Sequence, residues 1–96
     1  MYAVILRFAD KARAPALMEA HKEWITRGFD DGVFLLVGGL QPDGGGAILA
    51  HGLPRADLEA RVAQDPFVEH GVVHAEILEI APGRTDARLA FLKAGQ

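Results

Sequence analysis

Residues 33–52 read VFLLVGGLQPDGGGAILAHG, and this stretch decides the fold. Its two apolar segments, Val33–Leu40 and Gly46–Gly52, flank Gln41–Gly45 (QPDGG), in which Pro, Asp and Gly are typical of a turn. The aliphatic residues of both segments favour extended structure. The sequence therefore predicts a β-hairpin in the middle of the chain.

Residues with a helical period stand on both sides of this hairpin. Before it, a helix is expected to begin at Pro15, since proline is tolerated in the first turn. Gly28 and then Asp30-Asp31-Gly32 are expected to supply its stop and turn. One face of this helix carries, at spacings of a 3.6-residue period, Leu17, His21, Trp24, Ile25 and Gly28. After the hairpin, a second helix is expected from Pro54 to Pro66, because the residue before a proline is pushed out of the helical region. Its inward face carries Leu58, Val62 and Asp65.

Two outer strands complete the order βαββαβ. Tyr2–Phe8 (YAVILRF) and Val72–Ile80 (VVHAEILEI) have strand composition. This order predicts an α+β, ferredoxin-like fold, with both helices on one face of a four-stranded antiparallel sheet of order 4-1-3-2. Residues 1–96 are thus expected to form a single domain, with a core at 1–82 and a tail at 83–96. Within the tail, residues 86–94 are expected to form a short helix that offers Leu89, Phe91 and Leu92 for docking.

The second face of the predicted sheet is also apolar and is expected to be buried. In strand two, Val33, Leu35 and Val37 alternate with Phe34 and Leu36, so both faces of the strand are apolar. Two short helices can cover only one face, whereas a sheet with one face in water should alternate apolar and polar residues. We therefore expect a homodimer that packs sheet against sheet.

The composition excludes several classes of function. Among 96 residues, 10 are Lys or Arg and 13 are Asp or Glu, for a net charge of -3 without a basic cluster, so we expect no nucleic-acid partner. The chain has no cysteine, which excludes disulfides, thiolate zinc sites and thiol catalysis. It also has no serine, so a serine nucleophile is impossible.

The hydropathy pattern indicates where in the cell the protein is expected to work. The longest apolar run, Val33–Leu40, is far too short to span a bilayer. The start of the chain, Met1–Val4, leads into an apolar segment that contains Arg7, which is not typical of a signal peptide. We therefore expect no membrane partner and a cytoplasmic location.

Two ionisable residues interrupt the apolar faces of the helices. His21 lies between Leu17 and Trp24 on the first helix, and Asp65 follows Leu58 and Val62 at the last turn of the second. An inward, unpaired charge is costly, and a carboxylate at a helix C-terminus also meets an unfavourable dipole. The predicted helices run antiparallel, so the start of the first lies beside the end of the second. We therefore expect His21 and Asp65 to pair.

The same edge of the sheet is expected to receive Arg7 from strand one and Gly38-Gly39 from strand two. An imidazole, a carboxylate, a guanidinium and small residues would then surround one crevice, as an acid–base site requires. Each residue also has a structural interpretation: a buried hydrogen-bonded histidine, a helix-ending aspartate, an arginine paired in the dimer, glycines that permit a bend. His51, His70 and His74 lack the spacing of metal ligands, so we expect no metal and no other cofactor.

Three motifs together resemble the YCII-related (YciI-like) family. These are His21-Lys22-Glu23-Trp24, the segment Asp65-Pro66-Phe67-Val68, and Gly71-Val72-Val73 before the last strand, within a resemblance that covers residues 1–82. The resemblance implies a dimeric ferredoxin-like fold of the dimeric α/β-barrel group, an active-site pair at His21 and Asp65, and elimination-type lyase chemistry. Gly39-Leu40 departs from the Gly-Pro that is frequent in the family, which affects the pocket rim.

These observations favour a small cofactor-independent enzyme that acts on a small organic substrate. In this interpretation His21 moves the proton and Asp65 orients the imidazole, while Arg7, Trp24 and Gly39 bind the substrate as anion anchor, apolar wall and rim. One alternative is a non-catalytic dimer that binds a small ligand or a partner and uses the pair only to satisfy buried polarity. Another is a cofactor-free monooxygenase of the wider barrel group, which no residue of the sequence selects.

Overall fold

The computed structural model describes residues 1–42 and 44–94. The predicted turn at Gln41–Gly45 includes Asp43, which lies outside the described residues. The main elements follow the order β1 (Tyr2–Phe8), α1 (Ala14–Asp30), β2 (Phe34–Gly39), β3 (Gly46–Ala50), α2 (Arg55–Ala63), α3 (Pro66–Glu69) and β4 (Val73–Glu79). Three shorter pieces are the 3-10 turn η1 (Lys11–Arg13) before α1 and, in the tail, η2 (Ala87–Leu89) and α4 (Phe91–Ala94).

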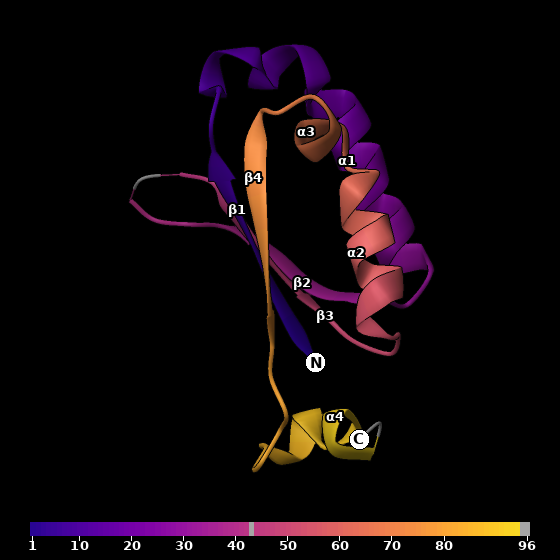
Figure 1. Ribbon diagram of the computed structural model, residues 1–96. Helices are drawn as coiled ribbons and strands as arrows, with labels where there is room; N and C mark the ends of the chain where they lie inside the picture. Colours follow the sequence, from indigo (N-terminus) through magenta and orange to yellow (C-terminus); the bar gives the residue numbers. More distant parts are fainter. Residues whose placement is uncertain (43, 95–96) are drawn as a thin grey trace.

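The four strands form one antiparallel sheet in the order β2-β3-β1-β4. Within it, Val4 of β1 stands opposite Ile48 of β3 and Ile77 of β4. Both long helices, α1 and α2, lie on the same side of the sheet (Figure 1). The fold is therefore the predicted α+β, ferredoxin-like arrangement, with the predicted strand order.

The core lies between the helices and the sheet. Trp24 of α1 and Leu58 of α2 are almost fully buried there, as are Val4 and Ile48 of the sheet. Each such side chain contributes about 1.5–3 kcal/mol by leaving water. At Gly28 the helix lies so close to the sheet that an ideal Cβ atom would be 2.1 Å from the ring of Phe34. Helix α1 continues through Gly28 and ends at Asp30, where the predicted turn Asp30-Asp31-Gly32 begins, and Gly28 itself serves close packing.

The second helix also ends earlier than predicted. Helix α2 stops at Ala63, and Asp65 has an extended backbone (φ -61°, ψ 123°) that places it at the N-cap of the short helix α3. Its carboxylate accepts a hydrogen bond from the backbone N–H of Phe67. The expectation of an unfavourable dipole at Asp65 was therefore wrong, because a carboxylate at a helix N-terminus is stabilised.

The face of the sheet opposite the helices carries an apolar row that crosses all four strands. The register places Leu36 beside Leu49, Leu49 beside Ala3, and Ala3 beside Leu78. Leu36 is 52% exposed and Leu78 is 46% exposed, although both are large aliphatic side chains. We call Leu36, Leu49, Ala3 and Leu78 the open-face row. In this structure of a single chain, these apolar side chains face solvent.

The tail runs beyond β4 to the end of the sheet that lies away from α3 (Figure 1). Of the three residues predicted to dock, Leu92 is buried, whereas Leu89 and Phe91 are 44% and 46% exposed. The ring of Phe91 meets His51 edge to face, with ring centroids 5.3 Å apart. Among the described residues, no helix has the length and hydropathy that crossing a membrane requires.

Candidate active site

The side chains of His21 and Asp65 meet between α1 and the start of α3. Nδ1 of His21 lies 2.7 Å from Oδ1 of Asp65 across 44 residues of sequence. The histidine side chain is 13% exposed, whereas that of the aspartate is fully buried. A charge-assisted hydrogen bond of this length is among the stronger polar contacts in proteins. The carboxylate fixes which imidazole nitrogen carries the proton in the neutral ring, since Nδ1 must donate to Oδ1.

Asp65 is held in place by the chain that follows it. Its Oδ1 also accepts from the backbone N–H of Phe67 at 3.0 Å, so one oxygen receives two donors. Its other oxygen, Oδ2, is buried without a hydrogen-bond partner among the described residues. A buried carboxylate in this position is compensated by the two donors that reach Oδ1, the imidazole of His21 and the N–H of Phe67.

Aromatic rings fix the plane of the imidazole. The ring of Phe67 lies parallel to that of His21, with centroids 4.0 Å apart and an angle of 4° between the planes. The indole of Trp24, one turn further along α1, lies 6.1 Å from the imidazole. His21 is therefore held at its edge by Asp65 and on its face by Phe67, and both come from one Asp-Pro-Phe segment.

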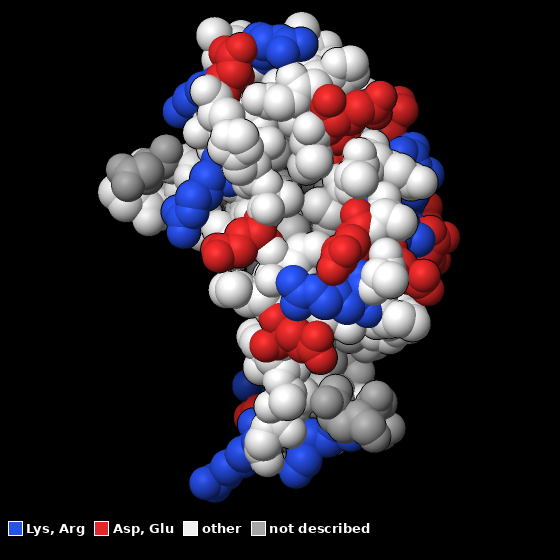
Figure 2. Space-filling view, viewed as in Figure 1, with Lys and Arg blue, Asp and Glu red and all other residues white. Residues whose placement is uncertain are grey.

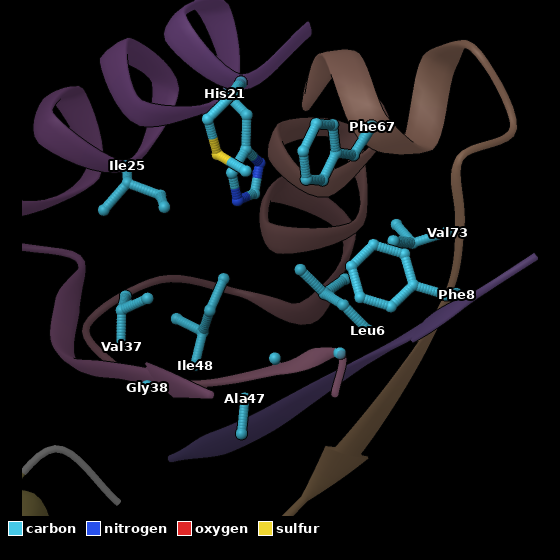
Figure 3. Close-up of a pocket in the computed structure, with 13 residues that line it drawn as sticks. Leu6, Phe8, His21, Ile25, Val37, Gly38, Ala47, Ile48, Phe67 and Val73 are labelled. Carbon is cyan, nitrogen blue, oxygen red and sulfur yellow. The ribbon is translucent and has the colours of Figure 1, made fainter. Parts of the chain in front are cut away.

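A cavity of about 190 Å³ opens beside the imidazole. It lies between α1 and the sheet, with His21 reaching into it from the helix and Phe67 and Phe8 on one side (Figure 3). Apart from the imidazole, its lining residues are apolar: Leu6, Phe8, Met18, Ile25, Val37, Gly38, Gly45, Gly46, Ala47, Ile48, Phe67 and Val73. Because Nδ1 is taken by Asp65, Nε2 is the nitrogen of His21 that remains for a ligand.

The turn between β2 and β3 forms one wall of the cavity. Gly45 has a positive φ of 88°, and an ideal Cβ atom on it would lie 2.4 Å from the carbonyl oxygen of Leu6. Only glycine permits this close approach of the turn to β1. The glycines of the predicted turn thus shape the cavity as well as reverse the chain.

The structure does not bring Arg7, Trp24 and Gly39 to the cavity wall. Arg7 alternates with Leu6 and Phe8, which line the cavity, and therefore lies on the open face, opposite His74 of β4. Trp24 is buried in the core, where its Nε1 donates to the carbonyl oxygen of Arg61 at 3.0 Å. At the rim it is Gly38, and not Gly39, that lines the cavity.

Sequence reasoning missed Phe8 and Phe67 as parts of the site. The signal for Phe8 was present, because the strand period of two puts Leu6 and Phe8 on one face and Arg7 on the other. Phe67 follows the Asp-Pro pair directly, but a helix of only 4 residues carries no periodicity that predicts which way its side chain points.

On the face seen in Figure 2, Lys and Arg are interspersed with Asp and Glu, so this surface has mixed charge.

Chemically, the arrangement provides a hydrogen-bonded imidazole at the wall of an apolar cavity. The carboxylate of Asp65 can stabilise the imidazolium that forms when Nε2 accepts a proton. Within the described residues, no group of three or more His, Asp and Glu side chains is arranged to hold a metal ion.

Comparison with known proteins adds one point on the fold. No protein-family model matches the chain. No curated protein matches it either. A solved structure with a similar fold is the 5-chloro-2-hydroxyhydroquinone dehydrochlorinase TftG from Burkholderia phenoliruptrix AC1100, in complex with 2,5-dihydroxybenzoquinone. The superposition has a TM-score of 0.68 and 14% sequence identity, and it covers 86% of this chain and 96% of TftG. At this identity, the likeness shows that the two chains share a fold.

Proposed function

We propose that this chain is a small-molecule enzyme in which His21 transfers a proton to or from a substrate held in the apolar cavity. The observation that carries the proposal is the 2.7 Å contact between Nδ1 of His21 and the buried Asp65, beside a cavity of about 190 Å³. Asp65 orients the ring and stabilises the imidazolium. This pairing of a base with an orienting carboxylate is the arrangement that general acid–base catalysis requires.

We propose further that the reaction is an elimination of lyase type. Nε2 of His21 takes a proton from the substrate, the electrons of the broken bond form a double bond, and the leaving group departs with its bonding pair. The imidazolium then returns its proton to solvent. Such a reaction needs only a base, so we propose that it proceeds without a cofactor. The dehydrochlorinase activity of TftG, which shares the fold, supports this choice of reaction class.

The resemblance to the YCII-related family supports the same proposal. The segment Asp65–Val68 supplies the carboxylate and the stacked ring of the site, and His21-x-x-Trp24 supplies the imidazole. We propose on these residues that the chain is a member of that family. We propose that it works in the cytoplasm.

We also propose that the active form is a homodimer. The open-face row is aliphatic and solvent-exposed in the single chain, and a second sheet packed on it would bury these side chains. Arg7 and His74, neighbours on the same face, would then lie at the border of the interface. A dimer of this kind leaves the His21 cavity, which lies on the helix side, within each protomer.

The experiment that tests the activity measures release of the leaving group. Purified protein is incubated with a panel of small hydroxylated chloroaromatic compounds, among them 5-chloro-2-hydroxyhydroquinone, and free chloride is quantified. His21→Ala is expected to lower the rate by about 10²–10⁴-fold, the usual contribution of a general base. His70→Ala, which removes an exposed histidine of α3's C-cap, serves as the matched control and is expected to keep the rate.

The outcomes separate the two interpretations of the site. Equal turnover by the wild type and His21→Ala would remove the catalytic role of the imidazole. Binding of a panel compound in the cavity without any turnover would favour a non-catalytic ligand-binding dimer, in which the His21–Asp65 pair only satisfies buried polarity.

A further inference from the structure

The ammonium of Lys11 lies next to Phe8, a residue of the cavity wall. Nζ of Lys11, in η1, lies over the ring of Phe8, 5.5 Å from its centroid, and Phe8 lines the cavity. An ideal Cβ atom on Gly44 would lie 3.6 Å from this Nζ and 3.5 Å from Cε2 of Phe8. Lys11, Phe8 and the β2–β3 turn therefore lie close together, next to Gly45 of the cavity wall.

The cavity and its rim differ sharply in character. Inside, His21 is the one titratable residue among the lining residues, and all others are apolar. Among residues 1–42 and 44–94, no carboxylate lies within 4.0 Å of the Lys11 ammonium to form an ion pair. The contact with Phe8 keeps the ammonium at the rim, since a cation is attracted to the face of an aromatic ring.

The size of the cavity indicates what fits inside it. An apolar cavity of about 150 Å³ holds a benzene molecule, so one of about 190 Å³ has room for a single substituted ring. The parallel arrangement of Phe67 and His21 adds flat surfaces to its wall. A ligand with its ring among these groups would present a substituent to the rim, where Lys11 stands.

We propose that Lys11 is a specificity-determining residue that selects a single-ring aromatic ligand bearing an anionic oxygen, a carboxylate or a phenolate, at the mouth of the cavity. This role is the one that sequence reasoning assigned to Arg7, which lies on the open face instead. The inference deepens the proposed function, because it names the ligand class of the same cavity. It is tested by binding and not by turnover.

The test compares two probes of nearly equal shape, benzoate and the neutral benzamide, by isothermal titration calorimetry. The wild type is expected to bind benzoate more tightly than benzamide. Lys11→Met is expected to weaken benzoate binding about two- to fivefold, the range of exposed charge pairs, and to leave benzamide binding unchanged. Because Lys11 is exposed and methionine keeps the length of its stem, this variant should fold as the wild type does.

The matched control removes a lysine charge at a position away from the cavity. Lys22 is exposed on α1, and its side chain lies among Glu19, Glu23 and Thr26, away from the cavity. Lys22→Met is expected to bind both probes as the wild type does. Changes in the NMR chemical shifts of the His21 imidazole and of the His21 and Phe67 backbone amides on addition of a probe show that the ring binds in the cavity.

Three results would overturn the inference. These are failure of the wild type to bind benzoate, an equal loss of benzoate and benzamide affinity in Lys11→Met, and an equal loss of benzoate affinity in Lys22→Met. Each differs from a failure of the proposed function, which would show as unchanged turnover in His21→Ala. If benzoate binds through Lys11 but no compound is turned over, the inference stands and the catalytic proposal fails.

Discussion

The imidazole of His21 and the phenyl ring of Phe67 are stacked, with centroids 4.0 Å apart and an angle of 4° between their planes. The backbone N–H of the same Phe67 donates to Oδ1 of Asp65, which also contacts the imidazole. A segment of three residues thus fixes both the edge and the face of the ring that we propose as the base. The geometry of the site depends on the N-terminus of α3 as much as on α1.

This relationship predicts the behaviour of Phe67→Leu. Leucine keeps much of the buried volume but removes the flat surface against the imidazole, so the ring of His21 can rotate about its hydrogen bond to Asp65. We expect kcat to fall by about tenfold, less than in His21→Ala, because the base itself remains. Steady-state kinetics on the compound found in the chloride assay measure the effect. Val68→Leu, a neighbouring half-buried position, is the control. A rate of Phe67→Leu equal to that of the wild type would contradict this positioning role.

Asp65→Asn separates the structural and chemical roles of the carboxylate. The amide oxygen can still accept from the N–H of Phe67 and from Nδ1 of His21, so the N-cap of α3 is retained. We expect the free energy of unfolding to fall by about 1–3 kcal/mol, because the amide NH2 takes the place of Oδ2, a buried position with no hydrogen-bond partner among the described residues. Activity should fall by about 10²-fold or more, since a neutral amide lacks the charge that stabilises the imidazolium.

The measurements for Asp65→Asn are urea denaturation and turnover of the same compound. NMR spectra that correlate the imidazole nitrogens with the ring protons give an independent readout. They are expected to show that the neutral ring of His21 in the wild type carries its proton on Nδ1. A variant that is strongly destabilised yet fully active when folded would instead assign Asp65 to stability alone.

Gly28→Ala tests the close packing between α1 and β2. The added methyl group would meet the ring of Phe34, because an ideal Cβ atom lies only 2.1 Å from its carbon atoms. We expect a loss of about 1–3 kcal/mol in unfolding free energy, although alanine is the better helix former. Gly83→Ala, where no atom lies within 4 Å of the added carbon, should change stability by less than about 0.5 kcal/mol. Equal stability of the two variants would show that the helix can move away from Phe34 without cost.

Leu36→Glu tests the proposed dimer. The substitution places a carboxylate at the β2 end of the open-face row, where a packed second sheet would have to bury it. Light scattering at micromolar concentration is expected to give the mass of a dimer for the wild type and of a monomer for Leu36→Glu. Leu89→Glu makes the same change at an exposed position of the tail and should remain dimeric. A monomeric wild type would refute the dimer directly.

Much of the fold follows from the sequence because its signals are local. Alternation and turn residues around the β2–β3 hairpin, together with a helical period before and after it, give the order and the sheet topology. The contact of His21 with Asp65 follows from the same reasoning, since antiparallel helices bring these positions together. The roles of the two residues in catalysis remain proposals.

The parts that were missed depend on geometry finer than the element order. Arg7 was placed in the crevice by its position near the end of β1, but the alternation of the strand turns it to the open face. The helix α3 has a single turn, so nothing periodic separates it from the end of α2. Lys11 lies in a connection between elements, where no pattern indicates the direction of a side chain.

The glycines at the β2–β3 turn have a consequence for how such a protein can diversify. Gly45 and Gly46 form part of the cavity wall, whereas the imidazole and the carboxylate stand on α1 and at the start of α3. The groups that react and the wall that admits a compound are therefore carried by separate stretches of chain. Insertions or substitutions in this one hairpin can therefore change which compounds enter the cavity without changing the groups that react with them.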